Sequence, residues 1–437
     1  MANTYLSRTF STPTNGKKFT FSAWMKRSSI SGDQAFFSTA TGTPITTFRW
    51  NSDNKIYLFQ IVGSSMVWEF ATNALYRDVN GWYHLVIAFD STENSAGDRL
   101  KLWINGEQVT SWSTQVNPAL DMTPTMNTAI RHDVANNRDG NYFNGSMSHV
   151  HFIDGTAYDA TAFGQYDANG VWTINTSPSV TYGNNGFFIL KDGNSVTDQS
   201  GNSNNWTVAG GTLTNTEDNP SNVFAVINAL DTTVPTANPV IISNGNTVLT
   251  GTNGTGIVGA CATIAVSQGK YYFEVSRLGT ANYAYVGVVK PGIGSITNIT
   301  GTLPICSYRN NGSTYSNLSV GTQDTWNTDG DIIMCAMDMD NGAIYFGKNG
   351  SWLNSGNPLS GATQTGAFGS FTPNSSDYYA PVLAGYNTST GLRANFGNGY
   401  FGTTAVSSAG TNASGIGIFE YDVPTGYTAL STKGLNL

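Results

Sequence analysis

The stretch GDIIMCAMDMDNGAIYFGKNGSW, residues 330–352, shows how this chain folds. The apolar runs IIMCAM and AIYF each have the length and the β-branched and aromatic content of a strand. Asn341-Gly342 and Asn349-Gly350 follow them. Asn-Gly is the strongest short-range signal for a two-residue hairpin turn, because both central positions need φ > 0. The stretch therefore predicts consecutive antiparallel strands.

The same alternation of strand and turn continues toward the amino terminus. In FTFSAWMKR (19–27), Phe19, Phe21, Ala23 and Met25 fall on one face of a strand. Further strands are predicted in KIYLFQIV (55–62), MVWEFAT (66–72), WYHLVIAFD (82–90), RLKLWING (99–106), GSMSHVHFIDG (145–155), GKYYFEVSRL (269–278), YAYVGVVK (283–290) and LRANFGNG (392–399). One short turn of helix is expected within 156–166. The fold class is therefore all-β, with two antiparallel β-sandwiches in tandem.

The composition agrees with a β-rich protein that displays an uncharged polar surface. Of 437 residues, 11% are charged and 12% are aromatic, and 49 are glycine. The usual charged share is about 25%. The net charge is −8, and no run of lysine or arginine forms a basic stripe. We therefore expect neither nucleic acid nor an anionic membrane surface as a partner.

The three cysteines, Cys261, Cys306 and Cys335, show no CxxC spacing. We expect neither a disulfide framework nor a zinc site, and Cys335 is predicted to lie in the core. The first residues lack the apolar region of a signal peptide, and no stretch of about 18 apolar residues exists to span a membrane. These features predict synthesis in a reducing cytoplasm without a signal peptide and without membrane insertion.

A polar passage rich in glycine and asparagine, residues 191–224, separates two sets of strands. At roughly 100–200 residues per domain, the chain length fits two domains. We predict a first sandwich over 1–190, a junction over 191–224, a second sandwich over 225–402 and an extension over 403–437. The extension either anchors the chain to a partner or packs on the second sandwich, through Phe419, Tyr421, Val423, Tyr427 and Leu430.

Four ordered segments of the first sandwich resemble a known family. They are FSAWMKR (21–27), GWYHLVIAFD (81–90), LKLWINGEQV (100–109) and GSMSHVHFIDGTAY (145–158). Their order and spacing are similar to those of a laminin-G-like, concanavalin-type lectin domain. The resemblance covers about residues 1–190 and implies a jelly-roll sandwich.

The second sandwich resembles a SPRY domain over about residues 225–402. The segments that carry this resemblance are GKYYFEV (269–275), YVGVV (285–289), the stretch 330–352, YAPVLAG (379–385) and RANFG (393–397). The pairing of the two domains, with a start like YLSRTF and an end like PTGYTALSTKGLNL, resembles structural proteins of tailed bacteriophages. This implies a tail-fibre, appendage or head-decoration component at the virion surface, made in the host cytoplasm and released by lysis.

The four histidines were each considered as catalytic or metal-binding groups. His84 is interpreted as a strand residue of the sandwich, not a general base. His149 and His151 are two residues apart and so share one face of a strand. Two imidazoles can hold a metal, but no further ligand cluster accompanies them. His132 is predicted to be solvated in a polar loop.

The acidic residues were tested for a glycosidase pair. Retaining hydrolysis needs two carboxyl groups about 5–5.5 Å apart, and some lectin-type sandwiches carry an E-x-D-x-E pattern for this purpose. Asp338 and Asp340 precede a hairpin turn and are interpreted as turn residues. The six glutamates are scattered, at Glu69, Glu93, Glu107, Glu217, Glu274 and Glu420. The chain is therefore predicted not to be an enzyme, although an aspartate pair from two strands stays open.

Calcium is a candidate cofactor in DVANNRDGN (133–141), because Asp and Asn oxygens are the ligands that calcium prefers. Asp133 and Asp139 are the candidate ligands. The segment lacks the spacing of an EF-hand loop, and polar loops of this kind are more often simple turns. No other cofactor is expected.

The remaining functional groups are polar and aromatic side chains in loops. Amides and hydroxyls bond to sugar hydroxyls, aromatic faces stack on sugar rings, and the same composition suits protein-binding loops. We select one loop from each sandwich, 138–142 and 305–317. The candidate ligand-binding residues are Arg138, Asp139, Asn141, Tyr142, Tyr308, Arg309, Asn310, Asn311 and Tyr315.

Together these features predict a non-enzymatic virion surface protein that binds a host-surface glycan or protein through its sandwich loops. We expect contacts with other virion proteins and a homo-oligomer, since weak single-site binding gains from multivalency. Two alternatives remain. One is an architectural spacer or decoration protein, and the other is a polysaccharide depolymerase.

Overall fold

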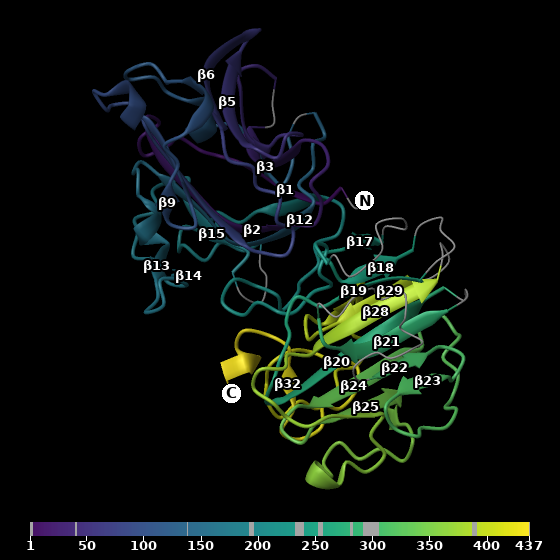
Figure 1. Cartoon of the computed structure of the whole chain (residues 1–437). Coiled ribbons are helices and arrows are strands. Elements are labelled where there is room, and N and C mark those ends of the chain that lie inside the picture. Colours follow the sequence, from purple (N-terminus) through teal and green to yellow (C-terminus); the bar gives the residue numbers. More distant parts are fainter. Residues whose placement is uncertain are drawn as a thin grey trace. The chain divides into compact units, whose positions relative to one another are not determined.

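The computed structural model describes residues 3–39, 42–137, 139–191, 196–231, 240–251, 257–279, 283–291, 306–386 and 391–436. The chain divides into two compact units, unit 1 (Met1–Asn215) and unit 2 (Thr216–Leu437) (Figure 1). Each unit is built from packed antiparallel sheets, and the predicted all-β fold is confirmed. In the described ranges, no helix is long and apolar enough to cross a membrane.

Unit 1 is a sandwich of an eight-stranded and a six-stranded sheet. The larger, called the β4 sheet, has the order β10 (Trp112–Val116), β6 (Ser65–Thr72), β5 (Ile56–Val62), β4 (Ile45–Trp50), β3 (Gln34–Thr39), β11 (Arg131–Val134), β1 (Tyr5–Thr9) and β16 (Thr207–Gly210). The other, called the β2 sheet, has the order β15 (Phe187–Ile189), β12 (Gly145–Asp154), β2 (Lys18–Arg27), β7 (Tyr83–Asp90), β8 (Leu100–Ile104) and β9 (Glu107–Gln108). The remaining elements are the hairpin of β13 (Gly164–Tyr166) and β14 (Trp172–Ile174) and the 3-10 turns η1 (Ala96–Asp98), η2 (Thr125–Asn127) and η3 (Ala160–Ala162).

The core of unit 1 lies between these two sheets and is rich in phenylalanine. The four alternating residues predicted for β2 all point into it and are fully buried. The ring of Phe21 lies 4.8 Å from that of Phe37 in β3, and the ring of Phe19 lies 6.3 Å from that of Phe48 in β4, so both pairs span the two sheets. Such pairs contribute about 0.5–1.5 kcal/mol each beyond the burial of their area. The aromatic composition of the strands is therefore what joins the sheets.

The opposite face of the β2 sheet is buried as well. Ser22 is fully buried and Trp24 is 6% exposed, although both point away from the core. Phe163 and Trp172, from the segment after β12, cover this face and pack against Val86 of β7. That segment includes η3, the short helical turn expected within 156–166. The central strands of unit 1 are thus enclosed on both sides.

The polar passage 191–224 is divided between the units instead of forming a separate junction. β16 pairs with β1 at the edge of the β4 sheet. Just before it, Trp206 is 3% exposed, and its ring lies 4.9 Å from that of Phe187. This tryptophan supplies the apolar area that attaches an otherwise polar segment to the core. Unit 1 therefore extends to Asn215.

Unit 2 is a second sandwich. One sheet, called the β20 sheet, has the order β17 (Ile241–Ser243), β18 (Val248–Thr250), β29 (Gly391–Asn395), β20 (Lys270–Leu278), β24 (Ile332–Asp338), β25 (Ala343–Lys348) and β26 (Ser351–Trp352), with β27 (Gly369–Ser370) beside β25 and β32 (Thr428–Ala429) beside β20. The other, called the β21 sheet, has the order β19 (Ile257–Cys261), β28 (Ala380–Tyr386), β21 (Ala284–Val289), β22 (Cys306–Arg309) and β23 (Thr314–Ser316). The remaining elements are β30 (Tyr400–Phe401), β31 (Thr404–Ala405), η5 (Gly361–Thr363) and η6 (Gly434–Asn436).

Both predicted hairpins of unit 2 are present, but the two-residue turn predicted at Asn341-Gly342 is wrong: residues 339–342 connect β24 to β25, and of these Gly342 alone has positive φ, of 69°. Asn349 and Gly350 have φ of 47° and 87°, as a type I′ turn requires. Asp338 accepts hydrogen bonds from the backbone N–H and the side chain of Asn341, at 3.0 and 2.8 Å. Asp340 accepts the N–H of Gly269 at 2.7 Å. The interpretation of both aspartates as turn residues is confirmed. The three cysteines are free and buried, and the prediction that Cys335 lies in the core is confirmed.

The carboxyl-terminal segment covers the outer face of the β20 sheet. Phe419 and Tyr427, each 1% exposed, pack with Tyr272 of β20. The rings of Tyr272 and Phe419 lie 5.0 Å apart and nearly perpendicular. β32 then pairs in parallel with β20. Of the two roles expected for the extension, packing on its own sandwich is the one that the structure shows.

A buried carboxylate fastens this segment. Glu274 of β20 is fully buried and accepts hydrogen bonds from the backbone N–H groups of Glu420 and Tyr421 and from the hydroxyl of Tyr272, each at 2.9 Å. Burial raises the pKa of Glu274 to about 7, against the opposing effect of these three donors. Glu274 therefore titrates near neutral pH, in contact with the segment that it holds.

We expect Glu274→Gln to flatten the pH dependence of unit 2 stability. The pKa of Glu274 in the folded unit lies above the unfolded value of 4.5. The stabilisation that protonated Glu274 gives to the fold is therefore complete below pH 4.5 and is lost as the pH rises through about 7. At about 1.4 kcal/mol per pKa unit, the loss is about 3 kcal/mol. Hydrogen exchange of β20 peptides between pH 5 and 8, corrected for intrinsic rates, measures it. Glu217→Gln, at a partly exposed carboxylate of the same unit, is the control. Equal pH slopes in the two variants would contradict the assignment.

Candidate functional site

The polar segment between β11 and β12 forms an ordered loop. The Asn137 side-chain oxygen accepts the backbone N–H groups of Asp139 and Asn141, at 3.1 Å each. The N–H of Ala35 in β3 donates to the carbonyl of Asn141 at 3.0 Å. Asp139 is exposed and Asn141 is half-buried. Arg138 lies outside the described residues. The loop is therefore attached to the end of β3, and its polar groups serve a turn.

The next residue of this loop, Tyr142, contacts Tyr5 of the β4 sheet, and Tyr5 in turn contacts Arg131. The rings of Tyr5 and Tyr142 lie 5.9 Å apart, and the Arg131 guanidinium lies 5.8 Å from the centre of the Tyr5 ring. All three side chains are partly exposed. We call Tyr5, Arg131 and Tyr142 the tyrosine platform. Of the three, Tyr142 was predicted from the sequence to bind a ligand.

The strand register explains why the platform faces outward. Leu6 of β1 is opposite Val134 of β11, and both belong to the core. Their strand neighbours therefore alternate to the outer face of the sheet. Tyr5 directly precedes Leu6, and Arg131 lies three residues before Val134. The alternation within YLSRT was the signal that could have identified Tyr5.

The two calcium candidates lie in different environments. Asp133 is 1% exposed, and its carboxylate is bound by Arg131 through Nε at 2.9 Å and Nη2 at 3.2 Å. Burial raises the pKa of Asp133, and Arg131 acts in the opposite direction. Asp139, in contrast, is exposed. Within the described residues, no group of three His, Cys, Asp or Glu side chains is placed to hold a metal. Asp133 serves instead to orient the arginine of the platform.

In unit 2 the structure corrects part of the candidate set. The loop expected over 305–317 is, from Cys306 onward, a hairpin of β22 and β23. Strand alternation turns Tyr308 inward, where it is fully buried and its hydroxyl donates to the carbonyl of Asp324. Asn310 is 6% exposed, and its oxygen accepts the N–H of Ala284 at 2.9 Å. Contrary to expectation, neither Tyr308 nor Asn310 is available to a surface ligand.

The other candidates of this hairpin face outward. The Arg309 guanidinium lies 3.7 Å from the centre of the Tyr283 ring, which is a close cation–π contact. Tyr315 is partly exposed, with its ring 6.2 Å from that of Tyr285. Asn311 is exposed in the turn. Tyr283 was not among the predicted residues, and its position directly before β21 was the available signal.

His84 of unit 1 is a buried, neutral residue of the sandwich. Its Nε2 lies 2.9 Å from the Ser22 hydroxyl, and its Nδ1 accepts the indole N–H of Trp172 at 3.0 Å. Burial lowers its pKa to about 3. The interpretation of His84 as a strand residue is confirmed. His149 and His151 both contact the ring of Phe188 on the same side of the sheet.

The prediction of a solvated His132 is wrong. His132 lies in β11, is fully buried and stacks on Phe10 at 3.7 Å. Its ring nitrogens lie 2.9 Å from the carbonyl oxygen of Ile130 and 2.6 Å from that of Met126. Burial lowers its pKa to about 4. The segment looked like a loop because its polar residues are close together, but three of them, Arg131, His132 and Asp133, form a strand with Val134.

The glutamates make separate structural contacts. Glu69 accepts a hydrogen bond from the hydroxyl of Tyr57, and Glu107 accepts one from Tyr166. Glu420 bonds to the backbone and side chain of Ser407. Glu274 is enclosed beneath the carboxyl-terminal segment, as described above. These arrangements are those of structural carboxylates, and none of these contacts pairs two carboxyl groups as glycoside hydrolysis requires.

Comparison with protein families identifies both units. Residues 2–162 match the family described as the concanavalin A-like lectin/glucanases superfamily, in its laminin G group. Residues 270–392 match the SPRY domain. The chain therefore contains a laminin-G-like domain of the concanavalin type followed by a SPRY domain. Both are typically binding domains without catalytic activity.

No curated protein matches this chain. Among solved structures, the SPRY domain of human HERC1 is 22% identical with a TM-score of 0.28, covering 36% of this chain and 91% of that one. The native heptameric SAP-like pentraxin from Limulus polyphemus is 15% identical with a TM-score of 0.27, covering 35% of this chain and 70% of that one. The identification of the two domains rests on the family matches.

We expect unit 1 to lose stability as the pH falls below about 6.5. His84 and His132 have folded pKa values of about 3 and 4, below the unfolded value of 6.5. Between these values the unfolded chain binds protons at both histidines and the folded unit does not. The stabilisation is present above pH 6.5 and is lost as the pH falls toward the folded values. At pH 5 the loss is about 2 kcal/mol for each histidine. Urea unfolding followed by tryptophan fluorescence at pH 7 and pH 5 measures it, and a constant midpoint would contradict it.

Proposed function

We propose that this chain is a non-enzymatic, lectin-like binding protein whose unit 1 holds a glycan on the tyrosine platform. The observation that carries the proposal is the gathering of Tyr5, Arg131 and Tyr142, from three separate segments, on one outward-facing patch. Tyrosine faces stack on the C–H faces of sugars, and a guanidinium supplies several hydrogen-bond donors to sugar oxygens. The concanavalin-type domain match supports this class of ligand.

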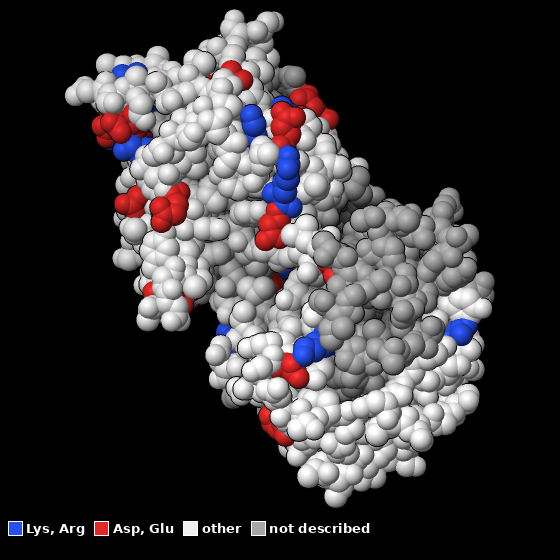
Figure 2. All heavy atoms as spheres, viewed as in Figure 1, with Lys and Arg blue, Asp and Glu red and all other residues white. Residues whose placement is uncertain are grey.

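The charge distribution also favours a glycan of low charge. Figure 2 shows that, on the face drawn, most of the surface is uncharged and acidic and basic side chains on unit 1 lie close to one another. Arg131 itself is paired with Asp133 at 2.9 Å. A ligand that binds through many negative charges would find little compensation there. Stacking and neutral hydrogen bonds are therefore the main source of affinity.

Unit 2 offers a second surface, suited to a protein ligand. Tyrosine and arginine are enriched among the residues that dominate protein interfaces. Arg309 and Tyr283 are in close contact, and Tyr315 and Asn311 lie on the same hairpin or beside it. The SPRY match supports a binding role for this unit. We propose that host-surface recognition uses both units, each through its own surface.

The proposed setting is the surface of a tailed-bacteriophage particle, where the chain is a fibre, appendage or decoration component. This rests on the resemblance of the paired domains and of the two ends of the sequence to such proteins. A homo-oligomer in contact with other virion proteins would present several platforms together. Multivalency of this kind raises avidity without any new contact.

We expect the double substitution of Tyr5→Ala and Tyr142→Ala to weaken glycan binding about tenfold, because stacking contributes about 0.5–1.5 kcal/mol per ring. The measurement is binding of the purified chain to a glycan array and to bacterial cells. Tyr166→Ala, at a tyrosine of the same unit that is 47% exposed, is the matched control and should bind as the unaltered chain does.

Three results would redirect the proposal. Equal binding by the double variant and the Tyr166 control would remove the platform from the function. Failure of the unaltered chain to bind any glycan or cell, together with co-assembly with virion proteins, would favour the architectural alternative. Release of reducing sugar from a host polysaccharide would establish a depolymerase in its place.

A further inference from the structure

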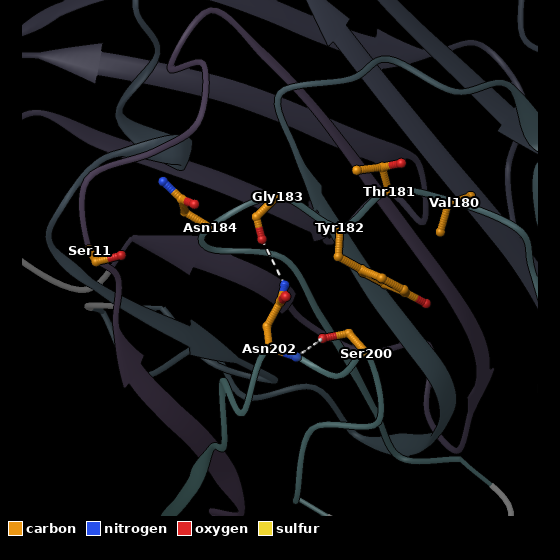
Figure 3. A pocket seen from close by; sticks show the side chains of 8 residues that line it. All are labelled: Ser11, Val180, Thr181, Tyr182, Gly183, Asn184, Ser200 and Asn202. Carbon is orange, nitrogen blue, oxygen red and sulfur yellow. Dashed lines mark hydrogen bonds between the residues drawn. The ribbon is translucent and has the colours of Figure 1, made fainter.

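Unit 1 contains a polar hollow that the platform does not involve. It has a volume of about 720 Å³ and is lined by Ser11, by the segment 180–184, and by Ser200 and Asn202. Figure 3 shows Asn202 directed toward Gly183, with Ser200 beside it. Sites for small ligands commonly have volumes of about 300–1,000 Å³. The hollow is open to solvent, and its volume lies within that range, so a ligand of one or two sugar rings can rest in it with one face toward the protein.

The walls of the hollow are held in place by buried hydrogen bonds. The carboxylate of Asp154, 2% exposed, accepts the N–H of Thr14 at 2.7 Å and the N–H of Asn185 at 3.1 Å. Asn202 donates from its side chain to the carbonyls of Gly183 at 2.7 Å and Gly186 at 3.1 Å. These bonds join three segments that are distant in sequence. A ligand would meet a site that is already formed, which lowers the cost of binding.

Glycine is required where the segment passes closest to the sheet. Gly183 has φ of 70°, and a Cβ there would lie 2.1 Å from the carbonyl oxygen of Asp154. At Gly186 a Cβ would lie 1.9 Å from the carbonyl oxygen of Tyr182. A side chain at either position would displace the wall of the hollow. The two close approaches hold Tyr182, Asn184 and Asn185 against the sheet.

The lining offers hydrogen bonds but no charge. Neither acidic nor basic side chains are among its residues. Asn202 uses its amide nitrogen on Gly183 and Gly186, so its oxygen is the group left to face a ligand. Asn184 likewise turns its nitrogen to the carbonyl of Thr12, at 3.4 Å. The Ser200 hydroxyl donates to Asp198 at 2.7 Å and accepts the backbone N–H of Asn202 at 3.2 Å, so it holds the wall in place. The two amide oxygens and the hydroxyl of Thr181 suit a ligand rich in hydroxyl donors.

We propose that this hollow is a second saccharide site of unit 1, and that its ligand is a neutral mono- or disaccharide unit. The ligand class rests on the proposed lectin-like function, but the site uses none of the platform residues. Hydroxyl groups of the sugar donate to the amide oxygens of Asn184 and Asn202. The partly exposed ring of Tyr182, which is hydrogen-bonded to His151 at 2.9 Å, lies at the edge of the hollow as an apolar contact.

The test is saturation-transfer NMR of the purified full-length chain with glucose, galactose, rhamnose and N-acetylglucosamine. Thr181→Arg places a long side chain in the hollow, and Asn184→Ala removes one amide oxygen; both residues are exposed, so the fold is retained. We expect at least one sugar to bind the unaltered chain, and each variant to weaken that binding tenfold or more. Asn169→Ala, at an exposed asparagine of the same unit, is the control and should change nothing.

The platform double variant separates this inference from the proposed function. Sugar binding that persists in the Tyr5 and Tyr142 double variant but is lost in Thr181→Arg supports the hollow. Binding that is unchanged in Thr181→Arg and Asn184→Ala overturns it, whatever the platform does. Absence of any signal from the four sugars with the unaltered chain also overturns it, and leaves glycan binding by the platform to be judged on the array.

Discussion

The structure depends on the need to cover both faces of the central strands, β2 in unit 1 and β20 in unit 2. A sandwich core covers one face, so each unit adds a second layer from its own chain. In unit 1 the segment after β12 brings Phe163 and Trp172 onto the β2 sheet. In unit 2 the carboxyl-terminal segment brings Phe419 and Tyr427 onto the β20 sheet. Polar groups on those faces are then removed from water and must find partners inside the protein.

Each unit buries a titratable side chain beneath its covering layer and gives it hydrogen-bond partners. The side chain is a histidine in unit 1 and a glutamate in unit 2. His84 is held neutral between Ser22 and Trp172. Glu274 is held among Tyr272 and two backbone N–H groups. Burial disfavours the charged form of either side chain, which lowers the pKa of a histidine and raises that of a glutamate. The same covering layers therefore give the two units opposite responses to acid.

The layers also direct where ligands can bind. Because the outer face of the β2 sheet is covered, its aromatic and imidazole side chains are structural. The outer face of the β4 sheet carries the tyrosine platform instead, where Tyr142 joins Tyr5 and Arg131 through the loop that Asn137 organises. The hollow lies where Asp154 and Asn202 tie the covering segment to its neighbours. Both candidate surfaces thus depend on how loops are attached to the sandwich.

The sequence alone determined the all-β class, the hairpins and the inward face of β2, because alternation and Asn-Gly turns are local properties. It also indicated that Asp338 and Asp340 serve a turn. The tertiary structure decided which polar residues are buried. His132, Tyr308 and Asn310 are enclosed by strands and segments that are distant in sequence. It likewise decided which residues meet at a surface, since Tyr5, Arg131 and Tyr142 are brought together by strand pairing between distant parts of the chain. A single sequence records the preference of each residue for a strand face, whereas proximity between strands arises only when the sheets assemble.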